Sequence, residues 1–531
     1  MREYVCWEIV CGGEKVKRLR TFLMNGLLLG ASSLFMRTVS VVWNAYVAAR
    51  IGAEGVGLFS LIMSVYLFAV TFASAGINLA VTRLVARELA AENEKGALAV
   101  VRKGALYALS FGFVAFVVLF FGADFFAVRV LRDARTALSL RAFSVSLPFI
   151  AVSGVFSGYF TAVRRVYKNA ATSIIEQFCK IGLTVLFLFI LSPRGMEYAC
   201  LALVLGSCLA EALSFFYLFI LYRLDRKKHM TGKGTGTDGK KPLAAIAGIA
   251  FPIALSSYLR SGLVTVEHIL IPRGLQKHGA DYAEALSAYG VVHGMAIPLI
   301  YFPLAVCTTF ASLIIPELSE LDTGKVYGNR YICYIIRRSL KFAALFSVGV
   351  AGIYLCFAGP LSELVYPGTD AGHYVRILAA IIPISYLDTV VDGMLKGLGE
   401  QLASMRYNII DAAVSVALVM TLLPLWGVSG YLVCVFVCEV LNFSLSIGRL
   451  YTVTGFRFPF FSGVAMPILC IAGATSLSLL CLRALPTMGK TPLCIVAILL
   501  SVLFYAVLLT ATGALNREER RWVAGMLQKE K

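Results

Sequence analysis

The stretch Ser146-Leu-Pro-Phe-Ile-Ala-Val-Ser-Gly-Val-Phe-Ser-Gly-Tyr-Phe160 is the most informative part of this sequence, because it returns in altered form later in the chain. Pro148 corresponds to Pro383 and Gly158 to Gly393, and the two pairs have the same spacing along the sequence (383 − 148 = 393 − 158). A self-similarity at such a fixed spacing is typical of a duplicated architecture. We therefore expect two copies of one helical arrangement.

A second similarity lies upstream at its own spacing. Arg37 and Asn44 stand seven positions apart, and so do Arg260 and Glu267 in the second copy. This spacing between the copies is somewhat shorter than that of the prolines, and a longer connection around residues 279–286 of the second copy accounts for the difference.

The composition is that of an integral membrane protein. The chain has 59% hydrophobic and only 15% charged residues, whereas soluble domains carry about 25% charged residues. Its apolar runs reach about 20 residues, which is the length a helix needs to cross a hydrocarbon core of about 30 Å. We expect about fourteen spans, over residues 22–47, 56–82, 104–123, 138–163, 169–192, 198–222, 243–268, 286–315, 339–358, 374–395, 404–425, 428–448, 462–482 and 491–512.

The fold class predicted from these features is an all-α polytopic membrane protein, with two pseudo-symmetric six-helix lobes and two C-terminal helices. The divisions are a cytoplasmic N-terminal segment (1–20), an N-lobe (21–222), a basic linker (223–242), a C-lobe (243–452), two more spans (453–515) and a cytoplasmic tail (516–531). An even number of spans in each copy makes the repeats parallel, and such repeats hold substrate between them.

Charge sets the orientation. Lys and Arg cluster before the first span and in the linker after the sixth, whereas the loop of residues 359–372 carries neither. By the positive-inside rule, both termini then lie in the cytoplasm of a multi-pass cell-membrane protein. The net charge of +18 thus follows from topology and does not indicate a nucleic-acid partner. The thirteen cysteines lie mostly inside spans as small apolar residues, so we expect no metal and no cofactor.

Ionisable residues inside spans are candidates for function, because burying them in lipid is costly. Arg37 and Asn44 lie about two turns apart, on nearly the same face of the first span. Arg260 and Glu267 repeat this arrangement in the second copy. Two arginines from the two copies predict a positive centre for phosphate or diphosphate in the central cavity. The structural alternative is that Arg37 pairs with an acid such as Glu211, or Arg260 with Glu267.

His293 is a third polar candidate, in the middle of the eighth span. It could donate a hydrogen bond to substrate or titrate, but a lone histidine in a span is more often a packed polar residue.

Acidic residues gather in the second half of the chain: Glu267, Asp388, Asp392, Asp411 and Glu439. Carboxylates that converge from several helices could bind Na⁺ or exchange H⁺. We therefore expect possible ion coupling at Asp388, Asp392 and Asp411. The alternatives are that Asp392 lies near the membrane interface, and that Asp388 or Asp411 caps or bridges helices.

Several segments together resemble the stage V sporulation protein B group. This group is part of the polysaccharide-transport branch of the multidrug/oligosaccharidyl-lipid/polysaccharide exporter superfamily, which also contains lipid II flippases. The segments are Ile51-Gly-Ala-Glu-Gly-Val-Gly-Leu-Phe59, Ala75-Gly-Ile-Asn-Leu-Ala-Val-Thr-Arg-Leu-Val-Ala-Arg-Glu88, Gly158-Tyr-Phe160, Ser173-Ile-Ile-Glu-Gln177, Gly294-Met-Ala-Ile-Pro-Leu-Ile300 and Pro316-Glu-Leu-Ser-Glu320.

The resemblance implies a fourteen-helix, two-lobed flippase with a central cavity. Such a protein moves an undecaprenyl-diphosphate-linked oligosaccharide or a peptidoglycan precursor across the membrane by alternating access. In the related lipid II flippases, cavity arginines on the first and later spans are required, and Arg37 matches the first of them. The other cavity arginines of that group have no clear match in this chain, where Trp43 and Thr71 stand near their places.

Other functions remain open at this point. A multidrug/cation antiporter of the same superfamily is one, although that branch carries an acid on the first span where this chain has Arg37. A membrane glycosyltransferase or saccharide ligase is another, but the predicted outer loops are short and poor in carboxylates and histidines. A scaffold that transports nothing would leave the arginines in the spans without a purpose. We therefore expect a transporter of lipid-linked saccharide and not an enzyme.

Overall fold

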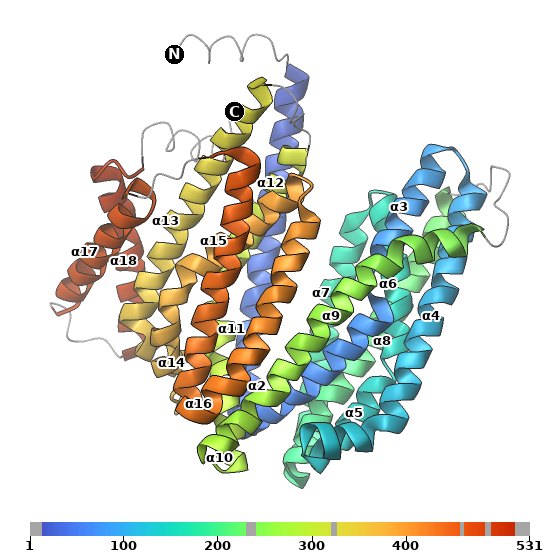
Figure 1. Ribbon diagram of the computed structural model, residues 1–531, viewed down its shortest axis with the longest axis horizontal. Coiled ribbons are helices and arrows are strands. Elements are labelled where there is room, and N and C mark those ends of the chain that lie inside the picture. Colours follow the sequence, from blue (N-terminus) through green and yellow to red (C-terminus); the bar gives the residue numbers. More distant parts are fainter. Residues whose placement is uncertain (1–12, 230–240, 320–325, 457–460, 484–489, 516–531) are drawn as a thin grey trace. The chain divides into compact units, whose positions relative to one another are not determined.

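The computed structural model describes residues 13–229, 241–319, 326–456, 461–483 and 490–515, and the regular structure in these residues is helical (Figure 1). The elements are α2 (Gly13–Ser74), α3 (Ile77–Ala90), α4 (Glu94–Phe125), η1 (Phe126–Leu131), η2 (Ala134–Thr136), α5 (Ala137–Ser144), α6 (Leu147–Ala162), α7 (Val166–Leu191), η3 (Ser192–Arg194), α8 (Met196–His229), α9 (Lys241–His278), α10 (Tyr282–Tyr289), η4 (Gly290–Ala296), α11 (Ile297–Ile300), α12 (Leu304–Ser319), α13 (Val326–Val365), α14 (Ala371–Leu378), η5 (Ala379–Ile381), α15 (Ile382–Gly397), α16 (Gln401–Thr454), η6 (Phe461–Ala465), α17 (Met466–Arg483) and α18 (Lys490–Ala511).

Within these residues, 11 helices are long and apolar enough to cross a membrane, and the bent pair Ala134–Ser144 and Leu147–Ala162 brings the number to 12. The chain is therefore a multi-pass membrane protein, as its composition predicted. α2, with 62 residues, and α16, with 54 residues, each join two helical segments across a break. α2 is interrupted at Gly52 (φ 68°) and α16 at Gly427 (φ 57°), and glycine adopts positive φ without steric cost.

The predicted duplication is visible in the helix bounds. α6 and α15 both begin with a proline in their first turn and have the same length, and both of their ends are related by the spacing that relates Pro148 to Pro383 (382 − 147 = 397 − 162). The turn after each helix holds one residue at positive φ, Arg164 (58°) in the first copy and Gly399 (79°) in the second. These two positions again have that spacing (399 − 164).

The duplication extends to packing. A Cβ on Gly158 of α6 would lie 2.7 Å from the carbonyl oxygen of Asn78 in α3, and a Cβ on Gly393 of α15 would lie 2.9 Å from the Cβ of Ala311 in α12. In both copies, therefore, a glycine allows the Pro-started helix to lie directly against an earlier one.

The chain divides into two compact units, and each is described by itself. Unit 1 comprises Met1–Ala49, Val291–Asp411 and Val435–Lys531, and unit 2 comprises Arg50–Gly290 and Ala412–Cys434.

Unit 2 contains α3 to α10. Within this unit, α7 packs along α8, and α6 packs on both α3 and α4. Helix α9 also packs on α3 and α4. Its core includes a buried hydrogen bond of 2.7 Å between the hydroxyls of Tyr66 and Ser146.

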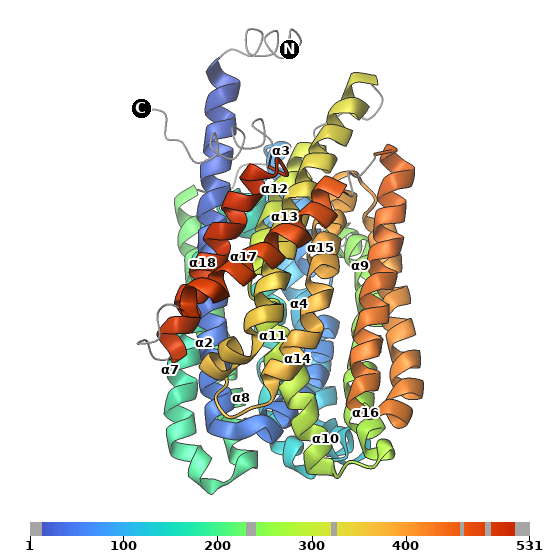
Figure 2. The ribbon, with the colours of Figure 1, turned by 90° about the vertical axis from the view of Figure 1, so that its left-hand side faces the viewer.

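Unit 1 contains α11 to α15 and the last two helices. Figures 1 and 2 both show α17 and α18 beside α13, and a buried cluster that includes Leu345, Ile471 and Tyr505 joins the three helices. The Tyr505 hydroxyl donates a 2.8 Å hydrogen bond to the carbonyl oxygen of Leu345. The two helices without a counterpart in the first copy are thus packed onto unit 1.

Parts of the predicted divisions lie outside the described residues: 1–12 of the N-terminal segment, 230–240 of the linker and the tail 516–531. The first residues of the predicted linker, up to His229, continue helix α8. The lobe boundaries themselves stay a prediction.

Candidate functional site

Two carboxylates of unit 1, Asp388 and Glu439, are the centre of a polar cluster between α15 and the last part of α16. Glu439 Oε1 accepts hydrogen bonds from the hydroxyls of Tyr301 (2.8 Å) and Ser385 (3.3 Å). Asp388 Oδ2 accepts a bond of 3.3 Å from the Asn442 side-chain amide. Neither carboxylate forms an ion pair with a basic group of the described residues. No positive side chain of these residues therefore compensates a negative charge on Asp388 or Glu439.

Helix geometry explains why these side chains meet. Glu439, Asn442 and Ser446 follow each other at spacings of three and four residues, so they occupy one face of α16. The Ser446 side chain on this face lies near the Asp388 carboxylate. The Oδ1 atom of Asp388 and the Oδ1 atom of Asn442 are buried and have no hydrogen-bond partner among the described residues. These two unused acceptors lie in the same cluster, where a cation or a proton would satisfy them.

The Tyr301 hydroxyl reaches the cluster because the eighth predicted span is broken there. Residues Tyr301 to Pro303 separate α11 from α12, and Pro303 has no backbone N–H with which to continue a helix. A small pocket of about 260 Å³, measured out to its mouth, lies beside the break. Its lining is apolar apart from two hydroxyls: Ile297, Ile300, Tyr301, Leu378, Ile381, Ile382, Ser385 and Val435.

The other two acids predicted for ion coupling differ from Asp388. Asp392 lies one turn further along α15, where Lys396 approaches to 2.5 Å and the Ser404 hydroxyl donates to Oδ1. A lysine thus already compensates its charge. Asp411 is half-buried, and its charge acts on Asp388. The structure therefore distinguishes Asp388 from Asp392, which the sequence treated alike.

Three more predicted residues lie in unit 1. The Arg37 side chain is exposed on α2 and has no acidic partner among the described residues, while Asn44 is half-buried two turns away. His293 is half-buried in η4, a π-helical segment that precedes Pro298. The predicted contacts of these residues with substrate stay a prediction.

Arg260 and Glu267 lie on α9 in unit 2. The Arg260 side chain is exposed, and no ion pair joins it to Glu267 or to another acid of the described chain. Glu267 is half-buried, and the Ser415 side chain lies near its carboxylate. The alternative in which the two residues neutralise each other is therefore not what the structure shows.

Sequence reasoning missed a buried charge network in unit 2. The side chain of Asp225 is 1% exposed, and it is held by Arg165, by Lys168 at 2.5 Å and by the Tyr159 hydroxyl at 3.0 Å. Arg165 and Lys168 belong to one short basic turn, and Asp225 lies 60 residues after Arg165 in the sequence. This network joins α6, α7 and α8.

Glu176 lies four residues before Lys180 on α7. It accepts a 2.8 Å hydrogen bond from Ser214 of α8, the charge of Lys180 acts on it, and its own charge acts on Glu211 of α8. The second carboxylate, which comes from α8, was not anticipated.

A metal centre is not built by the described residues, which contain no group of three or more His, Cys, Asp or Glu side chains close enough to bind one ion. The Asp388 cluster has two carboxylates together with neutral hydroxyl and amide groups. Such a set suits a monovalent cation or a proton.

Comparison with known proteins gives a family and a fold. Residues 22–310 match the model of the family described as polysaccharide biosynthesis protein. The chain is 25% identical over 419 residues to stage V sporulation protein B of Bacillus subtilis (strain 168), covering 77% of this chain and 80% of the relative. It is 21% identical over 438 residues to the lipid II flippase MurJ of the same organism, covering 77% and 78%.

Two solved structures show the same fold. The lipid II flippase MurJ in an inward closed conformation matches with a TM-score of 0.67 and 13% identity, over 92% of this chain and 99% of that one. An inward-facing multidrug resistance transporter of the MATE family matches with a TM-score of 0.58 and 15% identity, over 81% and 99%. The resemblance drawn from sequence segments is confirmed.

Proposed function

Because this chain belongs to the polysaccharide biosynthesis protein family, whose model matches its residues 22–310, we propose that it is a flippase for a lipid-linked saccharide. Its cargo is an undecaprenyl-diphosphate-linked oligosaccharide or a peptidoglycan precursor. It carries the cargo across the cell membrane by alternating access and performs no covalent chemistry. The relative that is a lipid II flippase supports a cargo of this class.

One observation carries the proposal: Arg37 and Arg260 are exposed side chains within apolar helices, and neither has an acidic partner among the described residues. An arginine in a membrane is stable only where water or an anion reaches it. In our proposal each copy supplies one arginine to the cavity between the repeats, and the two guanidinium groups hold the diphosphate in bidentate contacts. Asn44, Glu267 and His293 contact the saccharide, while the prenyl chain stays in lipid.

The topology we propose has fourteen spans with both termini in the cytoplasm. Dividing α2 and α16 at Gly52 and Gly427 turns the 11 apolar helices into thirteen, and the bent pair adds the fourteenth. Twelve of the spans form two six-helix lobes, and α17 and α18 follow them. The orientation rests on the distribution of Lys and Arg between loops.

We propose Na⁺ or H⁺ coupling at Asp388, supported by its buried and unpartnered Oδ1 atom and by the neighbouring Glu439. The same cluster favours a second candidate function, a cation-coupled multidrug antiporter, since the chain also has the fold of a MATE transporter. Arg37 argues against it, because a positive side chain disfavours cationic drugs.

Translocation of a fluorescent undecaprenyl-diphosphate-linked saccharide in proteoliposomes tests the function. We expect Arg37→Ala and Arg260→Ala each to lose about tenfold or more of the rate, and the lysine variants to keep part of it, because lysine retains the charge but not the bidentate contact. Arg87→Ala, at the last turn of α3, is the matched control for an exposed arginine without an acidic partner in the described chain.

Full activity of the double variant Arg37→Ala/Arg260→Ala would exclude the proposed site. If the wild-type protein flips no saccharide but exports cationic dyes along an ion gradient, the antiporter is correct.

A further inference from the structure

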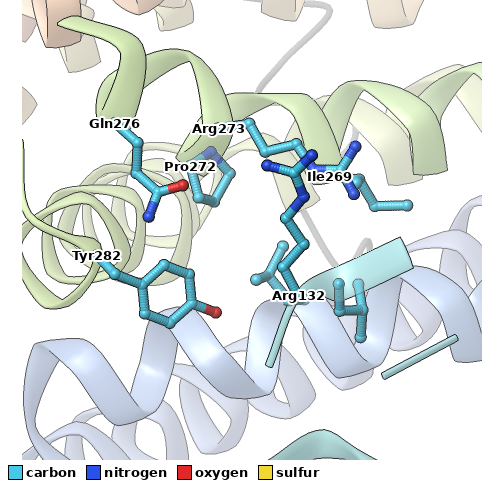
Figure 3. A pocket seen from close by; sticks show the side chains of 8 residues that line it. Arg132, Ile269, Pro272, Arg273, Gln276 and Tyr282 are labelled. Carbon is cyan, nitrogen blue, oxygen red and sulfur yellow. The ribbon is translucent and has the colours of Figure 1, made fainter. Parts of the chain in front are cut away.

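A second group of arginines surrounds a pocket within unit 2. Figure 3 shows this pocket, and Arg132 and Arg273 extend their guanidinium groups toward one another on one side of it. The space within and in front of it amounts to about 250 Å³, open solvent included. The lining combines these two arginines with one amide, one phenol ring and apolar side chains: Leu61, Leu131, Arg132, Ile269, Pro272, Arg273, Gln276 and Tyr282.

Local backbone structure places the two arginines. Arg132 ends the π-helical turn η1 in the left-handed conformation (φ 59°), which turns the chain directly after the span Glu94–Leu131. Arg273 follows Pro272 near the end of α9. Both arginines therefore lie at or near the ends of candidate membrane spans, the part of a span that meets the polar headgroup region.

The positive charge of this pair is not neutralised by the described residues. The two guanidinium groups repel each other, and neither forms an ion pair with a carboxylate of the described chain. Nη2 of Arg273 donates to the carbonyl oxygen of Val130, and its Nε atom is buried with no hydrogen-bond partner among the described residues. A buried, unused donor on a cation indicates a missing acceptor.

The nearby acids are already engaged. Asp133 accepts bonds from Nε (3.0 Å) and Nη2 (2.7 Å) of Arg135 and from the Tyr282 hydroxyl (3.1 Å). Glu54 accepts from Nη1 of the same arginine at 3.1 Å. Asp281 and Glu284 are exposed and cap the first turn of α10. Arg132 and Arg273 have no ion-pair partner among the described residues and are therefore available to an external anion.

We propose that this pocket binds a phosphate group on a lipid, at a site separate from Arg37 and Arg260. Two adjacent guanidinium groups can donate to several oxygens of a phosphate, which offers more acceptor oxygens than a carboxylate, and a lipid-linked diphosphate would also match their two charges. The Gln276 amide adds a neutral hydrogen-bonding group, and the apolar lining suits the carbon atoms next to the phosphate.

The phosphate has two possible sources. With the orientation of our proposed topology, the pocket lies at the outer end of unit 2, where a flipped cargo would present its diphosphate; this source rests on the proposed function. The other source is the headgroup of an anionic phospholipid, which needs no transport activity.

Native mass spectrometry of the full chain, released from detergent, tests the proposal with phosphatidylglycerol, phosphatidylcholine, an undecaprenyl-diphosphate-linked saccharide and inorganic phosphate as probes. We expect Arg132→Ala/Arg273→Ala to weaken binding of phosphatidylglycerol or of the lipid-linked saccharide by about tenfold or more. Arg129→Ala removes the same charge from η1 outside the lining and should change it less than about twofold.

The preferred probe identifies the source. Stronger arginine-dependent binding of the lipid-linked saccharide indicates the cargo, and stronger binding of phosphatidylglycerol indicates the headgroup. Equal affinity of the double variant and the wild type for every probe overturns the proposal, as does a preference for inorganic phosphate over both lipids. The variants Arg132→Lys and Arg273→Lys distinguish loss of the site from misfolding. They keep the charge and should bind the lipid probes with intermediate affinity.

Failure of the proposed function is recognised separately. Arg37→Ala should slow flipping by about tenfold or more and leave binding at Arg132 and Arg273 intact. If the wild type flips no saccharide, arginine-dependent binding of phosphatidylglycerol still decides whether the pocket is a phosphate site.

Discussion

The contact between Gly57 and Gly290 in unit 2 gives a sharp prediction about stability. A Cβ on Gly57 of α2 would lie 2.1 Å from the carbonyl oxygen of Leu286, and a Cβ on Gly290 would lie 2.1 Å from that of Ala53. The contact is thus reciprocal, and on both sides the obstacle is backbone, which cannot rotate away.

The expected magnitude follows from the distance. Atoms of this kind do not approach below 3.0 Å, so Gly57→Ala must separate the two segments by at least 0.9 Å (3.0 − 2.1). Overpacking of this kind costs about 1–3 kcal/mol of the free energy of unfolding. Alanine also favours the helix over glycine by about 1 kcal/mol, which partly offsets the cost.

Gly182→Ala is the matched control, because Gly182 lies inside helix α7 and an added Cβ there meets no atom within 4 Å. It should gain up to about 1 kcal/mol from helix propensity alone. Equilibrium unfolding in mixed SDS–detergent micelles should therefore rank Gly57→Ala about 1–3 kcal/mol below Gly182→Ala, the difference being the packing cost.

The double variant Gly57→Ala/Gly290→Ala should cost less than the sum of the single variants, because the first separation already admits the second methyl group. If Gly57→Ala unfolds at the same free energy as Gly182→Ala, the close approach of the two segments is refuted.

Two further predictions concern charged groups. Asp225→Asn should lower the free energy of unfolding by about 3 kcal/mol, because it leaves Arg165 and Lys168 without their buried counter-charge. The control Asp124→Asn, in the exposed pair with Arg141, should cost about 1 kcal/mol or less. Equal losses in the same unfolding assay would contradict the role of burial. In proteoliposomes, Asp388→Asn should remove the dependence of flipping on a Na⁺ or H⁺ gradient. The control Asp392→Asn should keep this dependence, because Lys396 already compensates Asp392. Unchanged gradient dependence in Asp388→Asn would place coupling elsewhere.

The class and the repeat could be predicted without tertiary structure. Hydropathy and span length depend on local composition, because a helix in lipid must satisfy its own backbone and present apolar side chains over its whole length. The spacing of Pro148 and Pro383 likewise identified two helices whose bounds agree in the structure. The predicted spans also placed connections at residues 48–55 and 426–427, where the structure interrupts α2 at Gly52 and α16 at Gly427.

The candidate site could be predicted only as a set of residues. Arg37, Arg260 and Asp388 were selected because charge within a span is costly, which is a local argument. Whether a charge is compensated depends on what another helix brings to it. Asp388 and Asp392 are one turn apart, yet Lys396 pairs with Asp392, whereas Asp388 receives a hydrogen bond from the neutral Asn442 amide.

A membrane protein of duplicated helices with charged residues in its spans could thus be recognised from the amino-acid sequence, since these properties follow from residue type and spacing along one chain. Tertiary structure was needed to show which charges are neutralised, as at Asp225, and which remain available, as at Arg132 and Arg273. The reason is physical: electrostatic compensation requires atoms within about 4 Å. Arg132 and Arg273 are far apart in the sequence, and they come together only through the packing of the helices that carry them.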